Sequence, residues 1–151
     1  MPVEVIRPLR GAVLRPGRPP EAAVWPLDDA PGTAHLAAYD DEVAPAEPVA
    51  VVSLLPAAYP GADASSRAYQ LRGMAVRPDL AGRGIGSTLL AVAIDAVRER
   101  GADLLWCNAR TSAASFYAAR GFVPDGAEFM PPELGIPHVR MRLDLRSTFR
   151  R

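Results

Sequence analysis

The sequence predicts an α/β protein in which helices flank a central sheet. Three features support this class: a strand-like run at residues 69–76, a glycine-rich turn that opens a long helix ending at Gly101, and a second short apolar run at residues 103–108. A strand, a crossover helix and a second strand form the unit that places two strands parallel in one sheet. Folds of this layout hold phosphate-bearing cofactors at a helix N-terminus.

The composition predicts one soluble globular domain over residues 1–151. Hydrophobic residues make up 49% and charged residues 23% of the 151 positions, as in ordinary soluble domains. No apolar run approaches the ~20 residues of a membrane span. The first residues lack the apolar core of a secretory signal, and a single cysteine allows no internal disulfide. We therefore expect a cytoplasmic location.

The charges exclude several classes of function. Acids and bases balance at 17 each, so no net field favours nucleic acid or an anionic membrane as a partner. All 17 bases are arginine, which excludes a Walker-type phosphate loop and a pyridoxal phosphate site, because both need a lysine. The histidines and the cysteine have no ligand-like spacing, so we expect no metal.

Residues 2–15 are expected to form a short amphipathic helix. Apolar residues recur at helical spacing, with arginines between them, at Ile6, Leu9, Ala12 and Val13. Pro8 fits such a helix only in its first turn or at a kink. Residues 16–32 hold five prolines and are expected to form a loop with at most one helical turn around Glu21–Val24. This loop is either a connector or a cover over a substrate pocket.

Two strands with a generous loop between them are expected next, at residues 35–39 and 49–55. The second is apolar at successive positions, which is typical of a strand covered on both faces. The strand at residues 69–76 is expected to stop at Arg77–Asp79, because Pro78 cannot donate to a ladder.

The glycine turn is a candidate anion site. Gly82, Gly84 and Gly86 let a phosphate approach the backbone of a helix N-terminus, whose free N–H groups point outward, and Arg83 adds a forked cation. A pyrophosphate site and a simple strand-to-helix turn both remain open. The dinucleotide fingerprint is absent, since Leu89 stands at its third glycine position. The helix has an apolar stripe at Leu89, Leu90, Ala93, Ile94 and Val97.

A short helix is expected after the second strand. Thr111 or Ser112 is expected to cap its N-terminus, and Gly121 is expected to end it. On this helix Tyr117 could protonate a leaving thiolate, or it could be an aromatic core residue. Cys107 and Trp106 are interpreted as buried core residues. Asn108, at the end of the strand, could bind a ligand or cap the next turn.

The segments AGRGIGSTLLAVAIDAVRERGA and NARTSAASFYAARGF resemble the GCN5-related N-acetyltransferase (GNAT) family, with the resemblance covering residues 69–123. It implies a central mixed, mostly antiparallel sheet splayed between two parallel strands and flanked by helices. It also implies acetyl-CoA as cosubstrate, bound in the splay. The implied activity is direct acetyl transfer, through a ternary complex, to a primary amine of a small molecule or a peptide.

The resemblance implies roles for individual residues. Met74 and Val76 match backbone partners of the pantetheine and acetyl group, and Tyr117 matches the proton donor to coenzyme A. Ala75, between the first two, is also a cofactor-binding candidate. The matches to the pyrophosphate loop are Arg83, Gly84, Ile85, Gly86 and Ser87. The further cofactor-binding candidates are Asn108, Ser112 and Phe116.

The acceptor side of the site departs from the family pattern. Gln70 and Arg72 occupy the strand where the family often keeps a glutamate, so His138 is the preferred general base, with Glu128 and water as alternatives. A structural role for His138 is equally open. Ala81 and Arg110 also replace usual cofactor contacts. A coenzyme A-binding sensor without catalysis is therefore the alternative hypothesis, and a homodimer is possible through the strands and the tail.

Overall fold

The structure is a computed structural model that describes residues 1–43, 46–61, 67–132 and 134–146. The chain forms two compact units, one of Met1–Leu55 with Leu71–Asp95 and the other of Pro56–Gln70 with Ala96–Arg151. The single domain expected over 1–151 stays a prediction. So does the homodimer, because residues 147–151 of the proposed pairing tail lie outside the described ranges.

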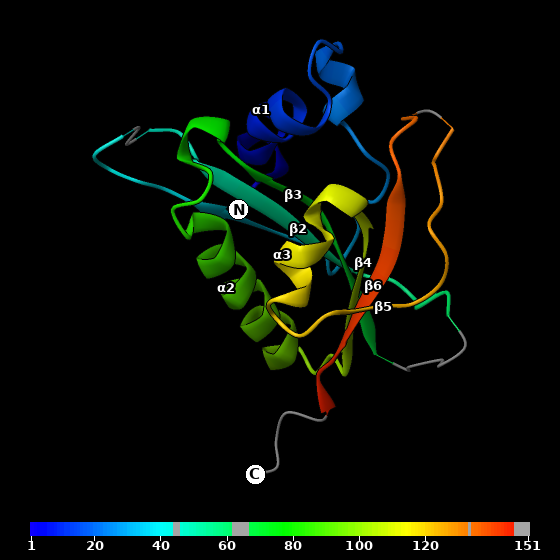
Figure 1. Ribbon diagram of the computed structural model, residues 1–151. Coiled ribbons are helices and arrows are strands. Elements are labelled where there is room, and N and C mark those ends of the chain that lie inside the picture. The colour runs from blue at the N-terminus through cyan, green and yellow to red at the C-terminus, as the bar shows by residue number, and fades with distance from the viewer. Residues whose placement is uncertain (44–45, 62–66, 133, 147–151) are drawn as a thin grey trace. The chain divides into compact units, whose positions relative to one another are not determined.

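From α1 to α3, helices and strands follow one another in the order that the sequence predicts (Figure 1). The elements are α1 Val3–Leu14, η1 Pro20–Ala23, β1 Ala34–Ala38, β2 Ala50–Pro56, β3 Ala68–Val76, η2 Pro78–Leu80, α2 Ile85–Glu99, β4 Leu104–Arg110, η3 Thr111–Ala113, α3 Ala114–Ala118, β5 Val123–Pro124 and β6 His138–Asp144. The strand order is β1-β2-β3-β4-β6-β5. β3 pairs with β4 in parallel, whereas the β1–β2, β4–β6 and β5–β6 pairs are antiparallel. The predicted mixed sheet is therefore confirmed.

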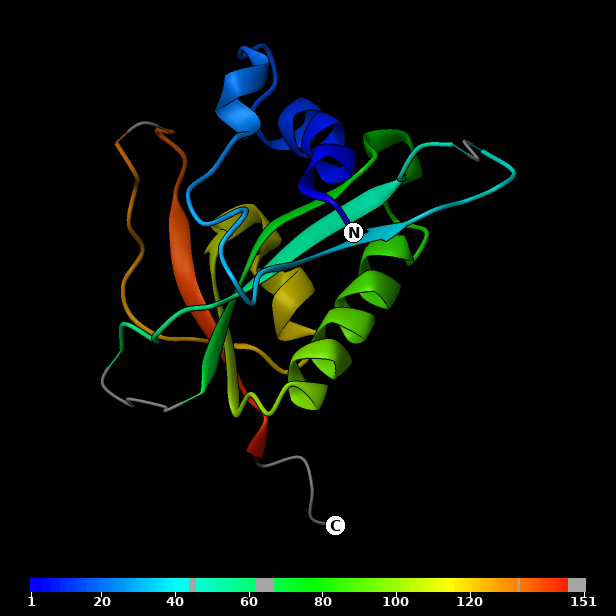
Figure 2. The same cartoon turned by 180° about the vertical axis from the view of Figure 1, so that it is seen from behind.

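In the first unit, α1 packs on one face of β1, β2 and β3, as Figure 2 shows from behind. Val3 and Ile6 contact Val51 of β2 and Ala75 of β3 in one apolar cluster. The predicted helix is confirmed, and it continues through Pro8, which lies inside it. The predicted apolar face is partly wrong: Ala12 is exposed, and the fully buried residue of the second half is Arg10.

The strands and α2 follow the predicted burial. Val49–Val52, Leu54 and Leu55 are all buried, as expected for a strand covered on both faces. The first turns of α2 lie on the face of β2 opposite to α1 (Figures 1 and 2). The predicted stripe of α2 is buried at every position, namely Leu89, Leu90, Ala93, Ile94 and Val97.

A buried ion pair joins α1 to the loop that follows it. Arg10 has no exposed surface, and its Nη2 donates to Asp28 Oδ2 at 2.6 Å and to the Ala23 carbonyl. Its guanidinium lies 3.9 Å from the ring centroid of Trp25, a cation–π stacking distance. The Trp25 backbone N–H donates to Asp28 Oδ2 at 3.1 Å. The guanidinium of Arg10 thus holds residues 23–28 against α1.

The same network reaches β1 and β2 through a buried histidine. His35 Nε2 lies 3.0 Å from the Asp28 carbonyl oxygen, and Nδ1 lies 2.7 Å from Ser53 Oγ. A carbonyl oxygen only accepts, so Nε2 carries the proton and Nδ1 accepts from the Ser53 hydroxyl. Ser53 Oγ in turn accepts from Arg10 Nη1 at 3.5 Å. Both ring nitrogens of His35 are therefore used within the fold.

The Asp28 carboxylate is stabilised in its charged form. Burial alone would raise its pKa, but the hydrogen bond from Arg10, the Trp25 N–H and the charges of Arg10 and Arg72 lower the pKa from 3.8 to about 2. Arg7 and Arg72 also approach this carboxylate, at 3.4 and 3.2 Å. Three guanidinium groups therefore share one carboxylate in this part of the molecule.

In the second unit, β4 is the central strand. Leu104–Trp106 pair in parallel with Ala68–Gln70, and all of β4 pairs with β6. The parallel ladder ends after three pairs, at the residue where the boundary between the units crosses β3. α3 covers one face of β4 and β6 (Figure 1). On the other face Tyr59 meets Trp106 edge to face at 5.9 Å, and the predicted core role of Trp106 is confirmed.

Replacing Asp28 with asparagine is expected to destabilise the fold by about 3 kcal/mol or more at pH 7, because Arg10 then keeps a buried charge without a partner. The folded-state pKa of Asp28 is depressed, so its stabilisation is complete above pH 3.8 and is lost as the pH falls towards 2. The free energies of unfolding of the Asp28→Asn variant and the wild type, measured in urea, should therefore converge as the pH falls over this range.

The control is Asp79→Asn, which removes a carboxylate paired with Arg77 on the surface. This change is expected to alter the free energy of unfolding very little, because an exposed ion pair is screened by water. A gap between the Asp28→Asn variant and the wild type that stays constant from pH 7 to pH 2.5 would contradict the role given to Asp28.

Candidate functional site

The turn before α2 depends on two glycines. β3 ends at Val76, η2 follows, and Gly82 and Gly84 then adopt φ values of 83° and 82°. Side-chain-bearing L-residues rarely adopt this left-handed conformation. A Cβ built at either position meets no atom within 4 Å. The turn is therefore formed by backbone conformation, and the space beside both glycines is open.

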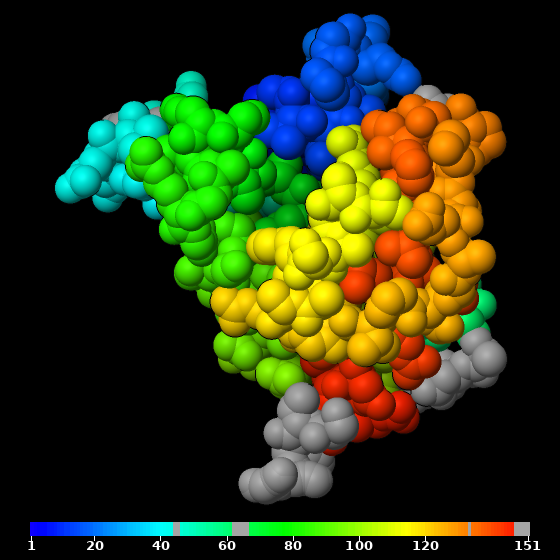
Figure 3. Space-filling view, viewed as in Figure 1, coloured from blue at the N-terminus to red at the C-terminus, as the bar shows by residue number. Residues whose placement is uncertain are grey.

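The turn presents a row of free backbone donors. The first helical hydrogen bond of α2 runs from Thr88 N to Gly84 O at 3.0 Å, and within the described ranges the N–H groups of residues 82–87 donate to no backbone carbonyl. These are the donors that every helix leaves unpaired at its first turn, where the helix dipole adds positive charge. The green surface of residues 81–84 is exposed at the end of α2 in Figure 3.

The side chains of the turn add one exposed cation. Arg83 is exposed, whereas the nearby Arg77 is held by Asp79 through bonds of 2.9 and 2.5 Å. Ala81 is exposed and offers no polar side chain. Ile85 and Ser87 are half-buried and Gly86 is buried. The predicted pyrophosphate loop is thus one continuous stretch of backbone with Arg83 at its surface.

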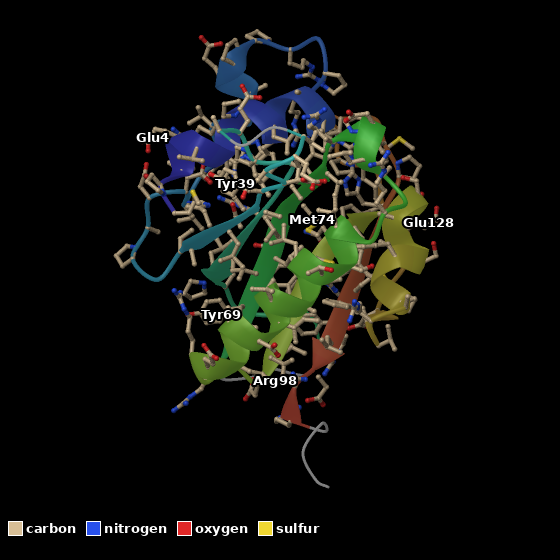
Figure 4. The ribbon with its side chains drawn as sticks, turned by 90° about the vertical axis from the view of Figure 1, so that its left-hand side faces the viewer. Glu4, Tyr39, Tyr69, Met74, Arg98 and Glu128 are labelled. Carbon is tan, nitrogen blue, oxygen red and sulfur yellow. The ribbon has the colours of Figure 1, made fainter. Side chains whose placement is uncertain are left out.

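The end of β3 contains an irregularity that the sequence reasoning missed. Gly73 has φ 69°, and a Cβ there would lie 2.9 Å from Cδ of Arg10 and 3.0 Å from the Trp25 ring. A glycine inside a strand pattern is itself the signal for such a distortion. Of the predicted backbone partners on β3, Ala75 is buried under α1, while Met74 (Figure 4) and Val76 are half-buried.

In the second unit, Tyr117 lies on α3 in an aromatic cluster. It is buried, and its ring meets Phe116 at 5.1 Å and Phe122 at 5.4 Å, both edge to face. Burial raises the pKa of Tyr117 well above its usual value, and the neighbouring Cys107 raises it further. The phenol therefore keeps its proton at neutral pH and can act as a donor.

The surroundings of Cys107 do not favour the thiolate form that a nucleophile needs. It is buried in β4, and burial raises its pKa from 9.0 to about 12. Its predicted role as a small buried side chain is confirmed. Asn108, the next residue, points to the opposite face of the strand, as neighbours in a strand do, and it is exposed.

The predicted cap on the helix after β4 is wrong. Residues Thr111–Ala113 form the 3₁₀ turn η3, and neither this turn nor α3 has a side-chain hydrogen bond at its N-cap. The chain continues from η3 directly into α3, so the N-cap position of α3 falls on Ala113. Ser112 is left exposed and Phe116 half-buried.

His138 opens β6 with its ring held in place. The backbone of His138 exchanges hydrogen bonds of 2.7 and 2.9 Å with Phe129, and the two rings lie 5.8 Å apart. His138 Nδ1 donates to the Ile136 carbonyl at 2.7 Å, since the carbonyl can only accept. In the neutral ring Nε2 is then the basic nitrogen. Glu128, on the segment before β6, is exposed (Figure 4).

The structure thus brings the predicted residues together in two groups. The first unit holds the end of β3 and the turn at residues 81–87. In the second unit Tyr117 influences Cys107, while the β4–β6 register places Arg110 opposite His138. Within the described ranges no three His, Cys, Asp or Glu side chains gather as metal ligands. In the same part of the chain, no helix has the length and apolar character of a membrane span.

A mixed sheet with free amides at the start of a long helix defines an α/β protein suited to an anionic cofactor. The sequence model of the acetyltransferase (GNAT) family matches residues 8–122, and the chain belongs to that family. It is also 32% identical over 146 residues to the uncharacterized N-acetyltransferase YitI of Bacillus subtilis strain 168, covering 97% of this chain and 94% of YitI. The protein is therefore an N-acetyltransferase.

Solved structures share the fold at low sequence identity. The NatC complex bound to Gag peptide and CoA contains a chain with TM-score 0.74 and 20% identity, and the match covers 95% of this chain and 91% of that one. The aminoglycoside 6'-N-acetyltransferase complexed with coenzyme A gives TM-score 0.72 and 14% identity, with 99% and 92% covered. These likenesses establish the fold.

The single thiol of the protein is expected to be unreactive in the folded state. Cys107 is buried and its pKa is raised to about 12, so almost no thiolate is present at pH 8. Ellman's reagent should release less than about a tenth of one equivalent from native protein and one full equivalent in guanidinium chloride. Rapid reaction of the native protein would show that this face of β4 opens to solvent.

Proposed function

We propose that the protein transfers the acetyl group of acetyl-CoA directly to a primary amine of a small molecule or a peptide. The observation that carries this proposal is the row of unpaired N–H groups at residues 82–87, at the start of α2. Such a row binds phosphate oxygens without any lysine, and the chain contains none. Membership of the acetyltransferase family supports coenzyme A as the phosphate-bearing partner.

In this proposal the diphosphate of coenzyme A binds the backbone from Arg83 to Ser87, and the Arg83 guanidinium adds a second contact. The backbone of Met74, Ala75 and Val76 binds the pantetheine and the thioester carbonyl. The two solved structures that contain coenzyme A support this choice of cofactor. Further cofactor contacts are assigned to three residues of the second unit: Asn108, Ser112 and Phe116.

The chemical step forms one bond and breaks another. The amine lone pair attacks the thioester carbonyl carbon, the carbon–sulfur bond breaks, and the leaving thiolate takes the phenol proton of Tyr117. Tyr117 suits this role because burial keeps it protonated. The proton lost by the amine goes to Nε2 of His138, which the Nδ1–H bond to Ile136 leaves as the basic nitrogen. Glu128 and a water molecule are the alternative acceptors of that proton.

The acceptor is proposed to be a primary amine. A peptide is bound in the NatC structure, and the aminoglycoside N-acetyltransferase is named for a small-molecule substrate, so relatives of this fold support both kinds of acceptor. The cytoplasmic location stays a prediction from the sequence.

Replacing Gly84 with alanine is expected to weaken coenzyme A binding at least about tenfold, a change of ~1.4 kcal/mol. The added Cβ enters open space beside the free amides and strains a backbone at φ 82°. Titration calorimetry with coenzyme A measures the effect. The matched control is Gly135→Ala, which introduces the same strain at φ 63° with no atom within 4 Å and should leave the affinity unchanged. Equal affinity of both variants would refute the diphosphate site.

Replacing Tyr117 with phenylalanine, or His138 with glutamine, is expected to lower kcat by about 100-fold, the low end for loss of a general acid or base. Coenzyme A affinity should change less than about twofold in both variants, because neither group is assigned to binding. Release of the coenzyme A thiol from acetyl-CoA, measured against a panel of amines, gives kcat.

The control for this assay is Tyr39→Phe, which alters an exposed phenol, whereas Glu128→Gln tests the exposed alternative base. A fall in kcat on Glu128→Gln with none on His138→Gln would move the base to Glu128. Full turnover by the Tyr117→Phe variant would remove Tyr117 as the donor, and coenzyme A binding without turnover on any amine would contradict acetyl transfer.

A further inference from the structure

A cavity of about 670 Å³ lies in the first unit between α1 and the loop that follows it. Its volume is in the range of small-molecule sites. The loop side is formed by Pro19, Pro20, Ala23 and Val24, and Ala12 lies on the helix side. Prolines fix the backbone of this wall before any ligand arrives. Of the two roles left open for residues 16–32, connector or cover, the cavity supports a cover over a pocket.

The walls of the cavity combine apolar surface with guanidinium groups. Val24 is 53% exposed although it is a large aliphatic residue, and it borders the cavity together with the exposed Ala12. Arg7, Arg15 and Arg18 line the same space, against the two acids Glu4 and Glu21. A ligand that fits both features has an apolar body and a negative charge.

The charge behind the cavity also favours an anion. Arg7, Arg10 and Arg72 all pair with the single carboxylate of Asp28. This group and the lining together contain five guanidinium groups and three carboxylates, a net charge of +2 in a chain that is neutral overall. Partly buried charge of one sign attracts a counter-ion more strongly than the same charge in water.

Arg7 connects the ion pair to the cavity. Its Nη2 lies 3.4 Å from Asp28 Oδ2, and its side chain is 23% exposed. Its Nε is buried and has no hydrogen-bond partner in the part of the chain that the structure describes. The Nε atoms of Arg10 and Arg72 share this state, and the contact with Asp28 fixes the Arg7 guanidinium beside the cavity that the residue lines.

We propose that this cavity binds a small amphipathic carboxylate, with its carboxylate at Arg7 and its apolar body between Ala12 and Val24. Planar guanidinium groups match carboxylates with two parallel hydrogen bonds. None of residues 81–87 lines this cavity, so its ligand binds at a different place from that turn.

The test titrates the full-length protein with hexanoate, 1-hexanol and hexylamine, which share one apolar chain and differ in charge. Amide chemical shifts report both affinity and location. Hexanoate is expected to bind at least about fivefold more tightly than 1-hexanol, hexylamine is expected not to bind, and the shifts should concentrate in α1 and residues 20–24. Equal binding of hexanoate and 1-hexanol would overturn the proposal.

Three variants make the result specific. Arg7→Gln should remove the preference for hexanoate over 1-hexanol, and Ala12→Leu, which fills the cavity from an exposed helical position, should weaken both at least about fivefold. Arg120→Gln, a matched exchange at an exposed arginine of the second unit, should change nothing. Thermal melting checks that each variant folds. If Arg7→Gln fails to fold, unchanged hexanoate binding by Ala12→Leu still refutes the site.

Discussion

A positive charge without any exposed surface organises the first unit. Arg10 is fully buried and needs a counter-charge, because an unpaired buried charge costs several kcal/mol. Asp28, the Ala23 carbonyl and Ser53 supply the partners, and Trp25 covers the guanidinium face. These partners come from the loop and from β2, so burying one side chain fixes α1, the proline-rich loop and the strands in one arrangement.

The same arginine shapes the strand that leads to the proposed cofactor site. Its Cδ and the Trp25 ring occupy the space where a Cβ of residue 73 would stand, so this position must be glycine. Gly73 distorts β3 immediately before Met74. The distortion alters how the following backbone groups are presented, because a left-handed residue interrupts the regular alternation of a strand. The close packing of Arg10 and Trp25 against Gly73 therefore lies directly beside Met74, the first residue of the proposed cofactor segment.

Polar groups in this protein are satisfied in two different ways. Around Asp28 every oxygen is bonded within the chain, and the result is a rigid junction. At residues 82–87 the backbone donors are left unpaired, and those of the exposed residues 82–84 lie at the surface, where water can bond them at little cost. Exposed donors in a fixed row remain available to an anion. In the second unit, burial keeps the proton on Tyr117, and a backbone carbonyl fixes the tautomer of His138.

The residues proposed for chemistry are set apart from similar residues by their surroundings. Cys107 and Tyr117 are both buried, and burial keeps the proton on both side chains, but only Tyr117 lies in the aromatic cluster with Phe116 and Phe122. His35 and His138 are both buried as well. His35 uses both ring nitrogens inside the fold, whereas the carbonyl at His138 occupies Nδ1 alone. Residue type therefore did not distinguish the two histidines, and their hydrogen bonds did.

The sequence by itself determined the elements whose signals are local. Residue spacing and the positions of glycine and proline within short windows predict five features. These are the apolar stripe of α2, the end of β3 before Pro78, the glycine turn, the doubly covered β2 and the parallel β4. Only the tertiary structure decided the burial of Arg10, the pairing of His35 with Ser53 and the cavity beside Arg7. The partners of Arg10 lie 13, 18 and 43 positions away, and no local pattern distinguishes an arginine that faces solvent from one that will meet a carboxylate. The predicted cap at Thr111 or Ser112 failed for a related reason, since the chain formed a 3₁₀ turn where the local residues also allowed a cap.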